Sequence, residues 1–141
     1  MALDQTEQRL RMALRRKKSA LQNAISDAEV NKRIAQDPNE SSERRAAARA
    51  KYNELQTQVE TLRSDVKKLE GDVSKEQGRK EVIEVKKNYD RLKKEYDLLI
   101  DKNSPEGKAL AEKLNAEVTK LNKAYEQSGS NVRVKPVTDY V

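Results

Sequence analysis

Residues 52–73 read YNELQTQVETLRSDVKKLEGDV, and their apolar side chains recur at intervals that alternate between three and four residues. This first row consists of Tyr52, Leu55, Val59, Leu62, Val66, Leu69 and Val73. Such spacing places the apolar side chains on one stripe of an α-helix, as in the seam of a coiled coil. A second row with the same alternation consists of Val82, Val85, Tyr89, Leu92, Tyr96 and Leu99. Both rows predict long helices that pack along a narrow face.

Turn signals divide the chain into four predicted helices, at about 2–36, 38–76, 79–102 and 105–127. In the sequence DPNE, Asp37 is placed to cap a helix and Pro38 suits its first turn. In the sequence NSPEG, Ser104 and Pro105 repeat this arrangement. A flexible segment, SGSN at 128–131, marks the end of the last helix.

Antiparallel folding within the chain suits these rows better than a parallel dimer does. In a parallel dimer, Asp65 would face a second acidic residue, Glu70, and no attractive pair would compensate. If the chain folds back near Asp37, facing residues have numbers that sum to about 76, and Arg9 and Arg11 lie level with Asp65. The seam residues expected to meet in the two hairpins are Leu10, Leu14, Leu21, Leu55, Leu62, Val66, Val85, Leu92, Leu114 and Leu121.

We therefore predict an all-α fold of two antiparallel coiled-coil-like helical hairpins with an extended C-terminal tail. Its parts are an N-terminal hairpin at 1–78, a second hairpin at 79–127 and the tail at 128–141. The residues between the two rows turn the seam to the opposite side of a continuous helix. Continuity would give an elongated S-shaped rod, and a break would give a folded four-helix bundle. Gly71 and Gly78 are unfavourable inside a helix and favour a bend at Gly78.

Composition argues against catalysis. The chain has no histidine and no cysteine, which removes the commonest general base, the commonest metal ligand and all thiolate chemistry. Carboxylate pairs such as Glu81 and Glu84 share a helical face, but nearby lysines favour their interpretation as solvated surface. No glycine-rich phosphate loop is present. We expect no enzymatic activity, no cofactor, no bound metal and no small-molecule substrate.

The formal charge of +6 is concentrated at the start of the chain, where residues 9–18 read RLRMALRRKK. Residues 1–36 contain eight lysines and arginines against four aspartates and glutamates. Cations on an accessible helix face can bind phosphates or an acidic protein surface. Because Arg9 and Arg11 are expected to offset the acidic flank near Asp65, the candidate contact residues that remain are Arg15, Arg16, Lys17 and Lys18. No aromatic side chain interleaves the cations, so base stacking is not indicated.

The C-terminal sequence SGSNVRVKPVTDYV combines a flexible start with alternating valines. An extended segment of this kind can add a strand to a partner's sheet, where Pro136 would confine it to an edge. A frayed tail is the alternative interpretation. The candidate contact residues in the tail are Val132, Val134, Val137, Tyr140 and Val141.

In general plan the chain resembles small helical-hairpin assembly proteins, such as phage scaffolding or virion-interior proteins and coiled-coil components of bacterial export machines. The resemblance rests on length, charge and heptads. It implies a non-enzymatic structural or assembly protein, a spacer, scaffold or adaptor with protein partners in a larger assembly. A second copy of the chain is a further candidate partner. The alternative function is a basic helical nucleic-acid-binding protein that uses the cluster from Arg9 to Lys18.

Apolar runs are short throughout the sequence, none exceeding three residues. The N-terminus also lacks the apolar stretch of a secretory signal. We therefore expect neither a signal peptide nor a transmembrane segment, no membrane partner, and a location in the cytoplasm or within a virion.

Overall fold

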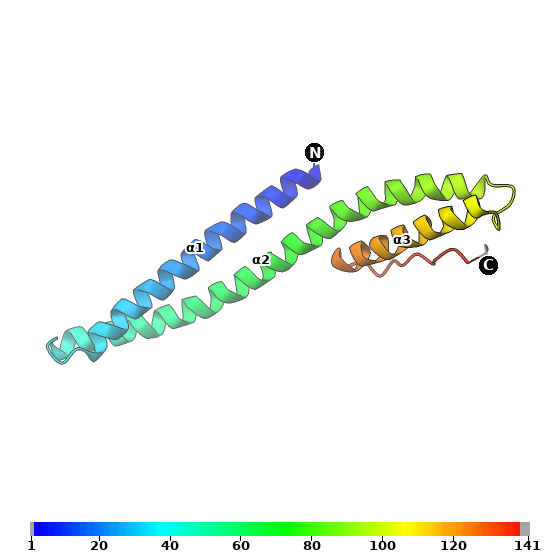
Figure 1. The fold of residues 1–141 in the computed structure, drawn as a ribbon. Coiled ribbons are helices and arrows are strands. Elements are labelled where there is room, and N and C mark those ends of the chain that lie inside the picture. The colour runs from blue at the N-terminus through cyan, green and yellow to red at the C-terminus, as the bar shows by residue number, and fades with distance from the viewer. Residues whose placement is uncertain (1, 139–141) are drawn as a thin grey trace. The chain divides into compact units, whose positions relative to one another are not determined.

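The structure is a computed structural model that describes residues 2–138, with side chains described from residue 5 onward. It contains three helices: α1 at Ala2–Gln36, α2 at Ser42–Asp97 and α3 at Pro105–Gln127 (Figure 1). The tail after α3 is extended, and the described residues contain no β-strand. The predicted all-α class is therefore confirmed, with one helix fewer than the four expected from the sequence.

Two compact units divide the described chain, an N-terminal unit at residues 4–73 and a C-terminal unit at residues 74–138 that also includes residues 2–3. Helix α2 contributes its first part to the N-terminal unit and its last part to the C-terminal unit. The boundary between the two units falls after Val73, and the tail belongs to the C-terminal unit.

In the N-terminal unit, α1 lies beside the first part of α2 (Figure 1). The centre of their shared core contains Ala24, Ala28, Leu55 and Val59, which are all buried. Leu21, Ile25, Tyr52 and Leu62 pack against that cluster and are partly exposed. Small alanines on α1 face larger residues on α2, so the core is a strip rather than a globular interior.

The register of this unit differs from the predicted one. Lys17, not Arg9 or Arg11, lies level with Asp65, and its Nζ donates to Asp65 Oδ2 at 3.1 Å. The residue numbers of this facing pair sum to 82 instead of about 76. A given residue of α1 therefore faces a residue of α2 that lies about one to two helical turns further along the chain than predicted. Part of the difference arises because the connection runs from Gln36 to Ser42, which moves the point of reversal along the chain.

The turn between α1 and α2 also corrects a predicted cap. Asp37 Oδ1 accepts a hydrogen bond from the Asn39 N–H at 2.9 Å, which closes a local turn instead of capping a helix. Ser41 caps α2, because its Oγ accepts from the Arg44 N–H at 3.1 Å. Asp and Ser are both good capping residues, and the local pattern did not distinguish between them.

In the C-terminal unit, α3 lies beside the last part of α2 (Figure 1). Ser104 caps α3 as expected, since its Oγ accepts from the Gly107 N–H at 3.1 Å and Pro105 occupies the first turn. The core of this unit contains Tyr96, Ala111, Leu114 and Val137, so one of its buried side chains comes from the tail.

The predicted seam residues differ in burial. Those that are buried are Leu55, Val66, Val85, Leu114 and Leu121. Those that are partly exposed are Leu10, Leu14, Leu21, Leu62 and Leu92. Most of the partly exposed seam residues lie on α1, which is the helix with the sparser apolar stripe.

Gly78 does not bend the chain, and the prediction of a break there is wrong. Helix α2 is continuous through Gly71 and Gly78. The missing side chain of Gly78 instead admits the end of α3, because a Cβ at this position would lie 2.5 Å from the Ser128 nitrogen. The adjacent Gln127 side chain donates to the Ser74 carbonyl at 3.1 Å and ties the end of α3 to the same stretch of α2.

We predict opposite effects of alanine at the two glycines of α2. Gly71→Ala meets no atom within 4 Å and should raise the free energy of unfolding by about 0.5–1 kcal/mol through helix propensity. Gly78→Ala should lower it by about 1–3 kcal/mol, because backbone atoms of α3 must move. Thermal unfolding followed by circular dichroism measures both variants. Stabilisation by Gly78→Ala would contradict the close approach of α3.

Candidate functional site

One face of α1 forms a shallow basic depression within the N-terminal unit. Its lining residues recur at helical intervals and are Arg11, Leu14, Arg15, Lys18, Ser19 and Gln22; we call this set the basic face. Arg11 pairs with Glu7 of the preceding turn at 2.9 Å. Within the described part of the chain, Arg15 and Lys18 form no ion pair. Their two charges are therefore available beside the apolar surface of Leu14.

The structure separates the four cations that sequence analysis singled out. Arg15 and Lys18 lie on the basic face, whereas Arg16 is exposed on α1 outside it. Lys17 contacts Asp65, and with 45% of its side chain exposed the pair contributes only about 0–1 kcal/mol. The basic face is thus narrower than the predicted cluster, and it includes Arg11, which sequence analysis had assigned to an acidic partner on the next helix.

Two asparagines of α3 hold the C-terminal tail by its main chain. Asn122 Oδ1 accepts from the Val134 N–H at 2.7 Å, and Asn122 Nδ2 donates to the Val134 carbonyl at 2.9 Å. Asn115 pairs with Val137 in the same way, accepting from its N–H at 2.6 Å and donating to its carbonyl at 3.1 Å. Each side-chain amide therefore satisfies both polar groups of one tail residue.

The spacing of these residues explains why the two pairs form together. Asn115 and Asn122 are separated by seven residues, which is close to two helical turns and about 10.5 Å along the axis of α3. Val134 and Val137 are separated by three residues, which span about 9.3 Å in a polyproline II conformation. A segment in that conformation repeats every three residues and would present both valines to the same side, as the hydrogen bonds to Asn122 and Asn115 require, and Pro136 between them is compatible with it.

Residues 131–138 do not form a β-strand in this structure, and the addition of the tail to a partner's sheet stays a prediction. A strand would turn Val134 and Val137 to opposite sides. The tail runs back along α3, with Val134 beside Asn122 and Val137 beside the earlier Asn115 (Figure 1). The N–H and C=O groups that a partner's sheet would need at these two residues are already bonded to the asparagines.

Val137 anchors the tail in the core of the C-terminal unit. It is 8% exposed and belongs to the cluster that contains Tyr96 and Leu114, both fully buried. The ammonium groups of Lys93 and Lys102 lie 5.7 and 5.6 Å from the centre of the Tyr96 ring, within the range of cation–π attraction. Val137 is thus packed into the core of the C-terminal unit rather than lying on its surface.

The other candidate tail residues have different environments. Val132 is exposed, Val134 is partly buried beside Asn122, and Tyr140 and Val141 lie outside the described residues. Sequence analysis did not identify Asn115 or Asn122. The available signal was a pair of asparagines seven residues apart on a helix that precedes an extended segment with the sequence Val-x-x-Val.

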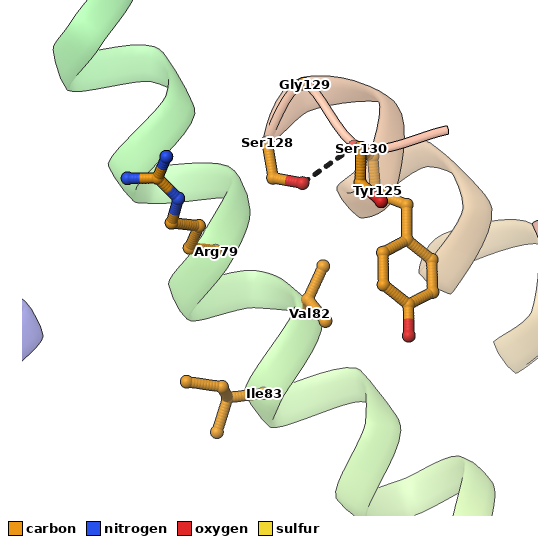
Figure 2. A pocket seen from close by; sticks show the side chains of 7 residues that line it. All are labelled: Arg79, Val82, Ile83, Tyr125, Ser128, Gly129 and Ser130. Atoms are coloured by element: carbon orange, nitrogen blue, oxygen red, sulfur yellow. Dashed lines mark hydrogen bonds between the residues drawn. The ribbon is translucent and has the colours of Figure 1, made fainter. Parts of the chain in front are cut away.

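A turn at the end of α3 reverses the chain into the tail and borders a cavity of about 470 Å³ within the C-terminal unit. Figure 2 shows the side chain of Val82 on α2 pointing toward Tyr125, whereas the side chains of Arg79 and Ile83, which also line the cavity, extend away from it. Ser128 Oγ donates to the Tyr125 carbonyl at 2.7 Å, and Gly129 adopts a φ of +84°, which favours glycine at a helix C-terminus. Arg79 at the rim is paired with Glu76.

Residues 2–138 hold no group of three or more acidic, histidine or cysteine side chains that could bind a metal ion. None of the helices in this range is both long enough and apolar enough to cross a membrane.

Comparison of the chain with models of known protein families, with curated proteins and with solved structures found no match.

We predict that Asn122→Ala releases the tail locally without unfolding α3. The variant loses two hydrogen bonds worth about 0.5–1.5 kcal/mol each, so protection of the Val134 amide against hydrogen exchange should fall at least tenfold. The exposed neighbour Lys123 provides the matched control, Lys123→Ala, which should leave that protection unchanged. Undiminished protection in Asn122→Ala would contradict the pairing.

Proposed function

We propose that the chain is a non-enzymatic structural or assembly protein, a spacer, scaffold or adaptor built from two antiparallel coiled-coil-like helical hairpins. The observation that supports this proposal best is the division of its residues between core and surface. Only 15 hydrophobic residues are buried among those the structure describes, and they form narrow strips along the helices. Most of each helix is therefore surface, which suits a protein that acts through contacts along its helices.

The basic face is our candidate for the principal contact. Arg15 and Lys18 carry charge without an intramolecular partner in the described chain, and Leu14 lines the same depression as a partly exposed apolar contact. A surface of this kind is complementary to an acidic helix with an apolar stripe. Phage virions and bacterial export machines contain assembly components of this general plan, and we propose a role of that class.

Charge reversal tests this proposal in the source cell. Arg15→Glu with Lys18→Glu reverses both free charges of the basic face, and Lys32→Glu with Arg33→Glu makes the same change in net charge elsewhere on α1. We expect the unmodified chain to be recovered in a stoichiometric complex with an acidic protein. The first double variant should lose that protein, and the second should retain it.

Recovery of the chain without any stoichiometric protein at physiological salt would contradict the assembly role. Equal loss of the partner from both double variants would contradict its assignment to the basic face. Quantitative mass spectrometry of the purified complexes provides the measurement in each case.

Nucleic-acid binding is the second candidate function, and the unpaired charges of Arg15 and Lys18 favour it. If it is correct, affinity for duplex DNA should fall steeply with salt, with a logarithmic slope of about −0.9 for each phosphate contact. Arg15→Gln with Lys18→Gln should then reduce the magnitude of that slope by about two. Fluorescence anisotropy of a labelled duplex measures this, and no binding at low ionic strength would eliminate this candidate.

A further inference from the structure

The contacts that hold the tail depend on its main chain more than on its side chains. All four hydrogen bonds from Asn115 and Asn122 go to backbone groups of Val134 and Val137. Among the side chains of residues 131–138, only Val137 is buried. We call the two asparagines and the core cluster that receives Val137 the tail site. Its ligand is an extended segment with free N–H groups at two positions three residues apart and an apolar β-branched residue at the second position.

Most side chains of the docked tail make little contact with the rest of the C-terminal unit. Val132, Arg133, Lys135, Pro136 and Thr138 are all exposed, so much of the ordered segment gains little from docking. Ordering each of these residues costs conformational entropy, which opposes the hydrogen bonds and the single buried side chain. The tail is joined to α3 by Ser128, Gly129 and Ser130, and Gly129 can adopt other conformations with little steric cost.

We propose that the tail site also accepts the C-terminal tail of a second copy of the chain, so that copies can be linked by tail exchange. A second copy carries the same Val-x-x-Val segment, so every hydrogen bond and the Val137 anchor are preserved between chains. The polypeptide's own tail has an effective concentration on the order of millimolar through its short connection and is favoured in dilute solution. Exchange therefore becomes significant where copies are concentrated, as within an assembly.

Two complementary full-length variants test tail exchange. Asn115→Ala with Asn122→Ala disables the tail site but leaves the tail intact. Val137→Asp disables the tail but leaves the site intact, because a carboxylate cannot enter the apolar cluster. In the second variant the site has no effective competitor from its own chain.

We expect the mixture to form a 1:1 complex that is absent from either variant alone, measured by sedimentation velocity at high micromolar concentration. Circular dichroism of each variant confirms that its helices are retained. As the control, Val137→Asp combined with Asn115→Ala and Asn122→Ala has no site, and it should form no complex with the tail-intact variant. No new species in the first mixture, or an equal amount in the control mixture, would overturn the proposal.

A peptide provides a second measurement that does not require two variants to fold. Residues 130–138 with an N-terminal fluorophore should bind the full-length Val137→Asp chain at least tenfold more tightly than the unmodified chain, whose own tail competes. A peptide in which proline replaces Val134 lacks the N–H that Asn122 requires and should not bind. Equal binding of both peptides, or no binding by the Val137→Asp chain, would overturn main-chain recognition by the tail site.

Discussion

A single narrow row of apolar side chains holds each unit together, and the other features of the structure depend on that constraint. In the N-terminal unit the row on α2 meets alanines on α1, as with Leu55 and Val59 against Ala24 and Ala28. A strip of this width buries little apolar surface. If the apolar residues of the two helices did not face each other, much of that stabilising burial would be lost. Beside the strip of the N-terminal unit, Arg15 and Lys18 are exposed and form no ion pair within the described residues, so their charges can contact other molecules.

In the C-terminal unit two further contacts add to the packing of the narrow apolar row. Gly78 allows the end of α3 to approach the backbone of α2, and the tail adds a third layer over α3. The tail can pack there only because Asn115 and Asn122 satisfy its main-chain polar groups, which would otherwise lose their hydrogen bonds to water. Side-chain amides on a helix thus perform the role that a neighbouring strand performs in a sheet. Val137 is therefore part of the core, and the tail that carries it is the segment that we propose to be exchanged between copies.

Much of the fold follows from local pattern, and the candidate sites follow from it only in part. The alternation through Leu55 and Val59 identifies the long helix, and Ser104 marks the start of α3. Gly78 was misjudged because its role is set by Ser128, which is 50 residues away in the chain. Asn115 and Asn122 were missed because their partners lie 22 and 12 residues further on. Local propensity carries no information about contacts of that range, and the contact of Lys17 with Asp65 is likewise set by the register of α1 against α2.

The central claim is that α1 folds onto α2 of the same chain in the register that places Lys17 beside Asp65. A zero-length carbodiimide crosslink between the Lys17 ammonium and the Asp65 carboxylate tests it directly, since the two atoms are 3.1 Å apart. The experiment uses an equal mixture of nitrogen-15-labelled and unlabelled protein, analysed by mass spectrometry of the linked peptides. We predict linked peptides that are entirely labelled or entirely unlabelled. Peptides that combine the two labels would show that the helices pair between chains and would contradict the account.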